Sequence, residues 1–162
     1  IVSFGHDIEG SWLLLEAAEV QGDPALTAQV RESVISMAEA VYREGLDDDG
    51  SLFYESGPHG LVDTGKAWWV QAEAVVGFYN AYQLSEEQVF MERSLGSWKF
   101  IQDNLIDPHL GEWYWSVDSQ GNPQTDKEKA GFWKCPYHNG RACLELIRRI
   151  DEKIIGEKLK ES

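Results

Sequence analysis

The sequence predicts an all-α fold made of helix hairpins that are joined by long loops carrying short β-hairpins. Five segments show the spacing of three to four residues between apolar positions that is typical of packed helices. Three of these segments are rich in aromatic residues and alternate with two that are plainly amphipathic, which indicates inner and outer helices. A similar helix start, mixing Trp with His or Glu, recurs at nearly equal intervals. This repetition predicts stacked or ring-closed hairpins.

The first two helices are separated by a short breaker cluster. Residues 7–20 are expected to form the first helix, with Asp7 as its N-cap or in its first turn. The Gln-Gly-Asp-Pro stretch at residues 21–24 interrupts it. The second helix is expected over residues 24–44, because its apolar residues keep helical spacing and Gly45 can close it.

A long loop is expected over residues 46–65. The acidic stretch from Asp47 to Gly50 lacks the alternating ligand spacing and the closing Glu of an EF-hand. It is therefore interpreted as a turn rather than as a calcium site. The following residues 51–54, Ser-Leu-Phe-Tyr, are expected to form a strand.

The third helix is expected over residues 66–84. It is apolar or aromatic on more than one side, which predicts burial all round. The Ser-Glu-Glu-Gln stretch at residues 85–88 has the pattern of a capping box and predicts the start of a fourth helix, which continues to about Leu105.

A second long loop is expected over residues 106–135, before the last helix. Within it, residues 112–117 are expected to form a strand that ends in a turn. The fifth helix is expected to start near Pro136, a residue type that suits a first turn, and to run past Arg149. Its charged tail, residues 157–162, is expected to fray.

Five helices make only two and a half hairpin units, and the chain opens directly on one of the repeated helix starts. A closed ring of hairpins needs more units than this. Residues 1–162 are therefore expected to be the C-terminal part of one larger domain. The open edges of such a part expose helix faces, which predicts a homodimer through these seams.

Composition narrows the classes of partner and compartment. The net charge of −14 and the sequence pI of about 4.6 argue against nucleic acid and anionic membrane surfaces. No apolar run approaches the roughly 20 residues that a membrane span needs. Cys135 and Cys143 fit no zinc or disulfide framework, so a reducing, cytoplasmic setting is expected. The seven tryptophans indicate either a large core or a pocket for flat ligands, sugars included.

Three clusters bring Trp together with His or Glu at the predicted helix starts. They are His6, Glu9 and Trp12; Trp69 and Glu73; and Trp133 and His138. In the first two, a spacing of three or four residues places the side chains on one helix face. Each cluster alone would be interpreted as an aromatic core helix with a satisfied histidine. The three together favour one shared polar site.

Other polar residues have plainer interpretations. His6 and Glu9 could ligate iron or zinc, but the chain lacks the additional helix-borne pairs that such a site needs, so a metal is not expected. His59 and His109 stand beside prolines in loops and are expected to be solvated or to belong to substrate loops. Arg141, one turn after His138, is expected either to pair with a pocket carboxylate or to form a structural ion pair.

Three motifs carry a resemblance to a known family. They are Gly-His-Asp-Ile-Glu at residues 5–9 together with Trp12, Trp-Trp-Val-Gln-Ala-Glu at residues 68–73, and Trp-Lys-Cys-Pro-Tyr-His-Asn-Gly-Arg at residues 133–141. In wording, order and separation they resemble the N-acylglucosamine 2-epimerase superfamily, and most closely its cellobiose 2-epimerase branch. The resemblance covers essentially this whole chain, but only the C-terminal portion of a family member.

The resemblance implies a fold, a reaction and residue roles. The fold would be part of an (α/α)6 barrel, in which inner helices line a sugar pocket. The reaction would invert C2 of the reducing-end glucose of a β-1,4-linked disaccharide without a metal or redox cofactor. The implied acid/base residues are His6 and His138, the implied polar pocket residues are Glu9 and Glu73, and the implied sugar-holding rings are Trp12, Trp69 and Trp133.

The chemistry of such a reaction suits histidine. Removing the C2 proton of an open-chain aldose leaves an enediolate, and histidine is the side chain that titrates near neutral pH. Two histidines on opposite faces could invert C2, or one could do so if the intermediate rotates about its C2–C3 bond. The alternatives are an N-acylglucosamine epimerase, a glycoside hydrolase that uses Glu9 and Glu73, and a non-catalytic sugar-binding module.

Overall fold

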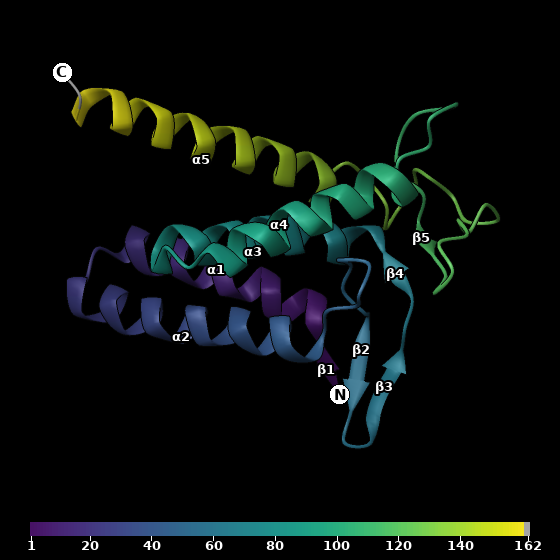
Figure 1. The fold of residues 1–162 in the computed structure, drawn as a ribbon, viewed down its shortest axis with the longest axis horizontal. Helices are drawn as coiled ribbons and strands as arrows, with labels where there is room; N and C mark the ends of the chain where they lie inside the picture. Colours follow the sequence, from purple (N-terminus) through teal and green to yellow (C-terminus); the bar gives the residue numbers. More distant parts are fainter. Residues whose placement is uncertain (161–162) are drawn as a thin grey trace.

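The computed structural model describes residues 1–160, apart from the side chains of residues 157, 159 and 160, and it confirms the predicted all-α architecture. The helices are α1 (Phe4–Gln21), α2 (Pro24–Glu44), α3 (Trp68–Ser85), α4 (Gln88–Phe100) and α5 (His138–Lys160) (Figure 1). A π-helical turn, η1 (Ile101–Leu105), continues α4 to the end that the sequence predicted.

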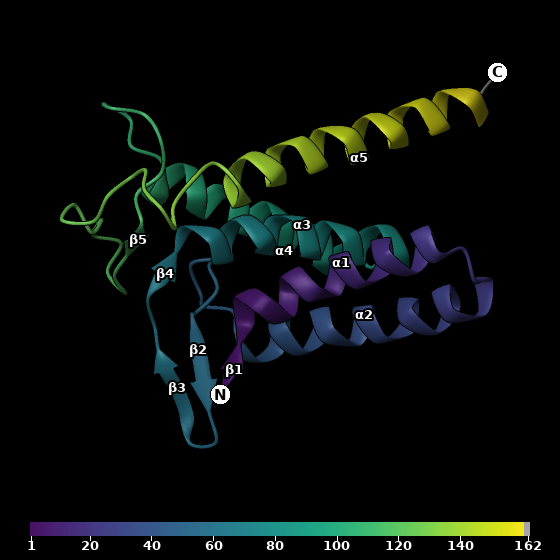
Figure 2. The same cartoon turned by 180° about the vertical axis from the view of Figure 1, so that it is seen from behind.

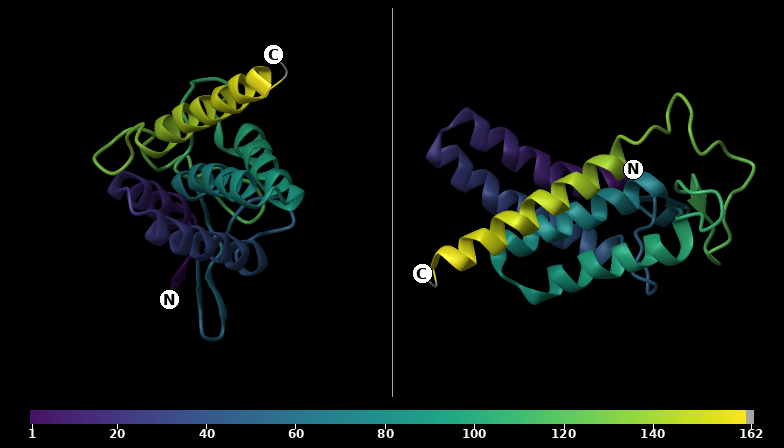
Figure 3. Two further views of the ribbon diagram at one scale, coloured as in Figure 1. Left: turned by 90° about the vertical axis from the view of Figure 1, so that its left-hand side faces the viewer. Right: turned by 90° about the horizontal axis from the view of Figure 1, so that it is seen from above.

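The helices form an inner layer of α1, α3 and α5 and an outer layer of α2 and α4, and α3 lies at the centre. This helix packs against α1, α2, α4 and α5, and every residue from Trp68 to Ala81 is buried, as its all-round apolar pattern predicted. Among the inner helices, α3 packs against both α1 and α5, whereas α2 packs on α1 and α4 packs on α3. Figure 3 shows α5 at one edge of this arrangement.

Local sequence explains where the first two helices begin and end. α1 starts at Phe4, three residues before the expected start, so Asp7 lies in its first turn and Ser3 is the N-cap. Gly22 closes α1 with a left-handed backbone (φ 75°), which glycine adopts without strain. Asp23 caps α2 because its Oδ1 accepts the main-chain N–H groups of Ala25 and Leu26.

Five short strands gather at one end of the molecule. They are β1 (Val2–Ser3), β2 (Glu55–Gly57) and β3 (Gly60–Asp63) in one antiparallel sheet, and β4 (Lys66–Ala67) and β5 (Ser116–Val117) in another.

Residues 51–54, which have strand character in sequence, form no strand; Leu52 makes only an isolated antiparallel bridge with Leu46. The side chain of Gln71 hydrogen-bonds to the main chain of Leu52: it accepts from the N–H and donates to the C=O, both at 2.8 Å. The strand expected over residues 112–117 shrinks to Ser116–Val117. These two residues pair with Ala67 and Lys66, which is why α3 starts at Trp68 rather than at Lys66.

Three further expectations concern turns and helix ends. The turn from Asp47 to Gly50 is confirmed by a hydrogen bond of 3.0 Å between the Gly50 N–H and the Asp47 C=O. The capping box at residues 85–88 does not form, because the Ser85 hydroxyl donates back to Ala81 C=O and α4 begins after Glu87. The expected fraying starts at residue 157, yet α5 continues to Lys160; residues 161 and 162 lie outside the described part.

The hairpin topology has one consequence for function. Because α2 and α4 each run back toward the end of the molecule where the strands lie, α1, α3 and α5 all begin at that end (Figures 1 and 2). The first turns of the three inner helices are therefore neighbours. Within residues 1–160, no helix combines the length and apolar character that crossing a membrane would require.

Candidate active site

A cavity of about 710 Å³ opens where the three inner helices begin. It is lined by His6, Tyr54, Asp63, Gly65, Ala67, Trp68, Trp69, Trp115, Ser116, Gln124, Trp133 and His138. The structure thus brings both predicted histidines and two of the predicted tryptophans into one cavity.

The two histidines share one aromatic neighbour. The ring of Trp69 lies 4.8 Å from the ring of His6 and 5.5 Å from that of His138, centroid to centroid. His6 is held by a hydrogen bond of 2.8 Å between its Nδ1 and the Ser3 hydroxyl. Gly5 permits this arrangement, because the Trp69 ring occupies the space that a Cβ at residue 5 would need. One indole ring therefore sets the positions of both imidazoles.

His138 is held from behind by a buried carboxylate. Its Nδ1 lies 2.7 Å from Oε1 of Glu73, whose side chain is only 1% exposed. Glu73 also accepts hydrogen bonds from Trp12 Nε1–H (3.0 Å) and Arg141 Nη2–H (2.7 Å). Because a carboxylate offers only acceptors, Nδ1 is the ring nitrogen that donates to Glu73, and Nε2 is the nitrogen that Glu73 does not engage.

Arg141 joins two carboxylates behind the histidine. Its Nη2 donates to Glu9 Oε1 at 2.5 Å and to Glu73 Oε1 at 2.7 Å, so of the two expected alternatives the structure has pairing with the predicted pocket carboxylates. Burial alone would lower the pKa of Arg141, but the hydrogen bonds to Glu9 and Glu73 outweigh it and the pKa lies above its ordinary value. The guanidinium therefore stays charged and prevents repulsion between the two carboxylates.

The predicted tryptophans divide into two groups. Trp133 is 77% exposed and Trp69 forms part of the cavity wall, so both offer surface to a ligand. Trp12 is only 1% exposed, with Arg141 against its ring at 4.8 Å. Its buried ring offers no face to a sugar, and its place in the site is to hold Glu73. Glu73 likewise reaches the cavity through His138 rather than directly.

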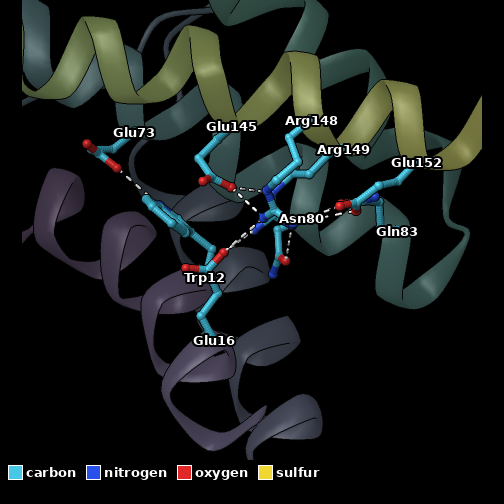
Figure 4. A network of polar contacts seen from close by, with 9 residues as sticks. All are labelled: Trp12, Glu16, Glu73, Asn80, Gln83, Glu145, Arg148, Arg149 and Glu152. Carbon is cyan, nitrogen blue, oxygen red and sulfur yellow. Dashed lines mark hydrogen bonds and ion pairs between the residues drawn. The ribbon is translucent and has the colours of Figure 1, made fainter. Parts of the chain in front are cut away.

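Below the cavity, a second polar cluster ties the same three helices together (Figure 4). Arg149 of α5 donates to Glu16 of α1 at 3.2 Å and to Asn80 and Gln83 of α3 at 2.9 and 3.0 Å. Its guanidinium also lies 5.8 Å from the centre of the Trp12 ring. Through its contact with Trp12, which donates to Glu73, this cluster helps to hold both side chains in place.

The carboxylates and His138 also form the one possible metal-ligand group found among the described residues. One ligand atom from each of Glu9, Glu73 and His138 lies within 4.8 Å of the others. Arg141 already donates hydrogen bonds to both carboxylates, so a cation bound between them would have to displace the guanidinium. In this structure the guanidinium therefore occupies the position that a metal ion would need.

Several cavity residues were not predicted. Trp68, Trp115 and Tyr54 line it from the start of α3 and from the two long loops. Trp68 directly precedes a predicted residue, and Trp115 belongs to an aromatic run in the second loop, so aromatic content was the available signal. His59 and His109 lie exposed in turns, outside the residues that line this cavity.

A buried ion pair holds the start of α3, and with it Trp68 and Trp69. Lys66 has no exposed surface, and its Nζ lies 2.6 Å from Asp47 Oδ2 and 4.0 Å from the centre of the Phe53 ring. Burial raises the pKa of Asp47, but the hydrogen bond from Lys66 outweighs it and the pKa lies below its ordinary value.

We expect Asp47→Asn to lower the free energy of unfolding by about 2 kcal/mol, because it leaves a buried ammonium without its main partner. The contribution of Asp47 is present above the ordinary carboxyl pKa of 3.8 and is lost as the pH falls below it. Urea unfolding at pH 7 and pH 3 measures both effects. Asp103→Asn breaks the exposed pair with Lys99, also 2.6 Å, and is the control. Equal effects of the two variants would contradict the prediction.

Comparison with known proteins agrees with this site. The sequence model of the N-acylglucosamine 2-epimerase (GlcNAc 2-epimerase) family matches residues 1–142. The chain is 48% identical over 148 residues to the cellobiose 2-epimerase of Bacteroides fragilis and 45% identical over 150 residues to that of Dictyoglomus turgidum. These alignments cover 91% and 92% of this chain, but 38% of each relative.

Solved structures give the same result. A sugar epimerase from a ruminal bacterium superposes with a TM-score of 0.86 at 43% identity, covering 91% of this chain and 38% of the other. Cellobiose 2-epimerase from Bacillus thermoamylovorans superposes with a TM-score of 0.82 at 45% identity, covering 91% and 37%. The alternating helices are therefore part of an (α/α)6 barrel, as the sequence resemblance implied. The chain belongs to the N-acylglucosamine 2-epimerase family.

Proposed function

We propose that this chain supplies the proton-transfer site of a sugar 2-epimerase that inverts C2 of the reducing-end glucose of a β-1,4-linked disaccharide, converting cellobiose to glucosyl-mannose. One observation carries the proposal. His138 lines the same cavity as His6, and Glu73 contacts its Nδ1 at 2.7 Å, so Nε2 is the ring nitrogen that Glu73 does not engage. The relatives named cellobiose 2-epimerase support this substrate class.

The reaction proceeds by proton transfer alone. In the open-chain aldose, Nε2 of His138 removes the C2 proton, and the electron pair of the broken C–H bond delocalises onto the C1 oxygen as an enediolate. A proton returned to the opposite face of C2 restores the aldehyde with inverted configuration. His6 delivers that proton in a two-base mechanism. In a one-base mechanism His138 returns it after rotation about C2–C3.

The cavity walls favour a disaccharide. Trp69, Trp115 and Trp133 supply aromatic surface for the apolar C–H faces of sugar rings, and together they line a space larger than one ring requires. N-acylglucosamine is the second candidate, because relatives of that name align at lower identity, 27% for the mouse protein. A hydrolase is disfavoured, since Glu9 and Glu73 are both engaged by Arg141 rather than facing a glycosidic bond.

Deuterium incorporation tests the proposal. Cellobiose is incubated in heavy water with this chain, and in parallel with the Bacteroides fragilis enzyme in which this chain replaces the aligned 38%. NMR then follows deuterium at C2 and the appearance of glucosyl-mannose. Deuterium at C2 together with the epimer supports an epimerase. If neither protein exchanges C2 of cellobiose or N-acylglucosamine, the non-catalytic sugar-binding alternative takes its place.

We also propose that this chain self-associates through α5. Apolar side chains form an exposed stripe on this helix, including Leu144 (69% exposed) and Ile147 (59% exposed). We expect light scattering to show a mass that rises with concentration, and Ile147→Lys to reduce that rise. Leu110→Lys, which changes an exposed leucine in a turn, is the control and should have no effect. A monomer at every concentration would contradict this proposal.

A further inference from the structure

The cavity wall that carries Trp133 and His138 has little regular structure to hold it. The described chain between η1 and α5 contains only β5, and the segment from Phe132 to Tyr137 is irregular. A flexible segment would not keep an imidazole within the narrow range of positions that proton transfer requires. Something other than secondary structure must therefore hold this segment.

The carboxylate of Glu112 contacts the residues that directly follow both cavity residues. Its Oε1 accepts from Lys134 Nζ at 3.0 Å and from Asn139 Nδ2 at 2.9 Å. Lys134 follows Trp133 and Asn139 follows His138. The two ends of the irregular segment thus meet on one oxygen atom.

The donors of both contacts are buried, whereas the side chain of their acceptor, Glu112, is 38% exposed. The side chain of Lys134 is 1% exposed, and its Nζ also donates to the Lys129 C=O at 3.0 Å and lies 5.3 Å from the centre of the Trp68 ring. Asn139 is buried as well. Because one side of each contact is withdrawn from solvent, the contacts are screened less than an ion pair between two exposed side chains.

The backbone of Glu112 has an uncommon conformation. Its φ of +61° lies in the left-handed region, which only one other non-glycine residue of the described chain adopts. Strain of this kind persists where surrounding contacts impose it, and it occurs at functional sites. Partial burial raises the pKa of Glu112, but hydrogen bonds from Trp113 N–H, Lys134 and Asn139 outweigh it, so the pKa lies below its ordinary value and the carboxylate stays charged at neutral pH.

We propose that Glu112 is a positioning residue whose carboxylate clamps both ends of the segment between Trp133 and His138, through Lys134 and Asn139, and so sets where the ring and the imidazole stand in the cavity. This role deepens the proposed epimerase function and rests on it for its kinetic consequences. The two contacts have separable effects. The Asn139 contact holds the base, whereas the Lys134 contact holds the aromatic wall.

Two variants separate these effects. Asn139→Ala removes the contact next to His138, and alanine is well tolerated in a helix. We expect kcat to fall about 10–100-fold with KM little changed. Lys134→Met removes the contact next to Trp133 and leaves no unpaired buried charge. We expect it to raise KM with kcat largely kept. The double variant Lys134→Met/Glu112→Gln should have nearly the same kcat and KM as Lys134→Met, because the amide oxygen still accepts from Asn139.

The control lies in the same loop. Asp118 accepts hydrogen bonds from Gln120 and Asn122 within its own turn and does not contact the clamped segment. Asp118→Ala should leave kcat and KM unchanged. A purely structural role for Glu112 would lower the melting temperature of all variants without a split between kcat and KM, and that result would overturn the proposal.

NMR of the His138 ring keeps the test independent of turnover. We expect the ring signals to move in Asn139→Ala but not in Asp118→Ala. Unmoved signals in both would overturn the positioning role even if the protein is an epimerase. Moved signals in a protein that exchanges no C2 proton would support the clamp and refute the proposed reaction. If Asn139→Ala fails to fold, the same comparison is made between Lys134→Met and Asp118→Ala on the Trp133 indole signal.

Discussion

We expect His138→Ala to lower the rate of deuterium incorporation at C2 of cellobiose by about 10²–10⁴-fold, the range that a positioned general base contributes. The reason is geometric. His138 is the cavity imidazole whose Nδ1 is held by a carboxylate, which leaves Nε2 to accept the substrate proton. The measurement is the NMR exchange assay in heavy water, made on both the chain and the chimeric enzyme.

Matched controls are available for this variant. His59→Ala and His109→Ala change exposed histidines in turns and should leave the exchange rate unaltered. A melting temperature close to that of the parent shows that the variant is folded. Exchange at the parental rate in a folded His138→Ala protein would exclude His138 as the base.

The same assay on His6→Ala distinguishes the two mechanisms. If two bases act, His138 still removes and returns the proton on its own face, so deuterium enters C2 while little glucosyl-mannose forms. If one base acts, the ratio of deuterium exchange to epimer formation stays the same as in the parent. The contact of both imidazoles with Trp69 is compatible with either outcome.

Glu73→Gln should have the second-largest effect, a loss of about 10²-fold in turnover. The amide is nearly isosteric but can present an NH₂ group to His138 Nδ1, which would reverse the tautomer and place the ring hydrogen on the catalytic nitrogen. It also weakens the hydrogen bond from Arg141, for which we expect a loss of about 2 kcal/mol in the free energy of unfolding.

Trp12→Phe is the matched comparison for Glu73→Gln. It removes the indole donor to Glu73 Oε2 but leaves the carboxylate and its contact with His138 in place. Its effect on turnover should be much smaller than that of Glu73→Gln, although both variants should lower the free energy of unfolding. Equal losses of turnover would show that burial of the pair, rather than the charge of Glu73, matters.

Sequence patterns predicted the helices well because the spacing of apolar residues along a helix is a local property of the sequence. They predicted the strands poorly: residues 51–54 have strand character, but the side chain of Gln71, distant in sequence, takes the hydrogen bonds of Leu52. Of the residues that the motifs predicted, His6, Trp69, Trp133 and His138 line the cavity, whereas Glu9, Trp12 and Glu73 do not, and sequence alone could not separate the two groups. Trp12 and Trp69 look alike in sequence, and only packing between α1, α3 and α5 buries one ring and exposes the other to the cavity.

The shared starting end of α1, α3 and α5 has an electrostatic consequence. Each helix carries a macrodipole whose N-terminus is equivalent to about half an elementary positive charge. His6, Trp69 and His138 all lie in first turns, so three positive helix ends surround the place where the substrate would lie. An enediolate is an anion, and its charge develops in the field of these main-chain groups. Under the proposed function, we therefore expect the alternation of hairpins to favour loss of the C2 proton through the main chain as well as through side chains.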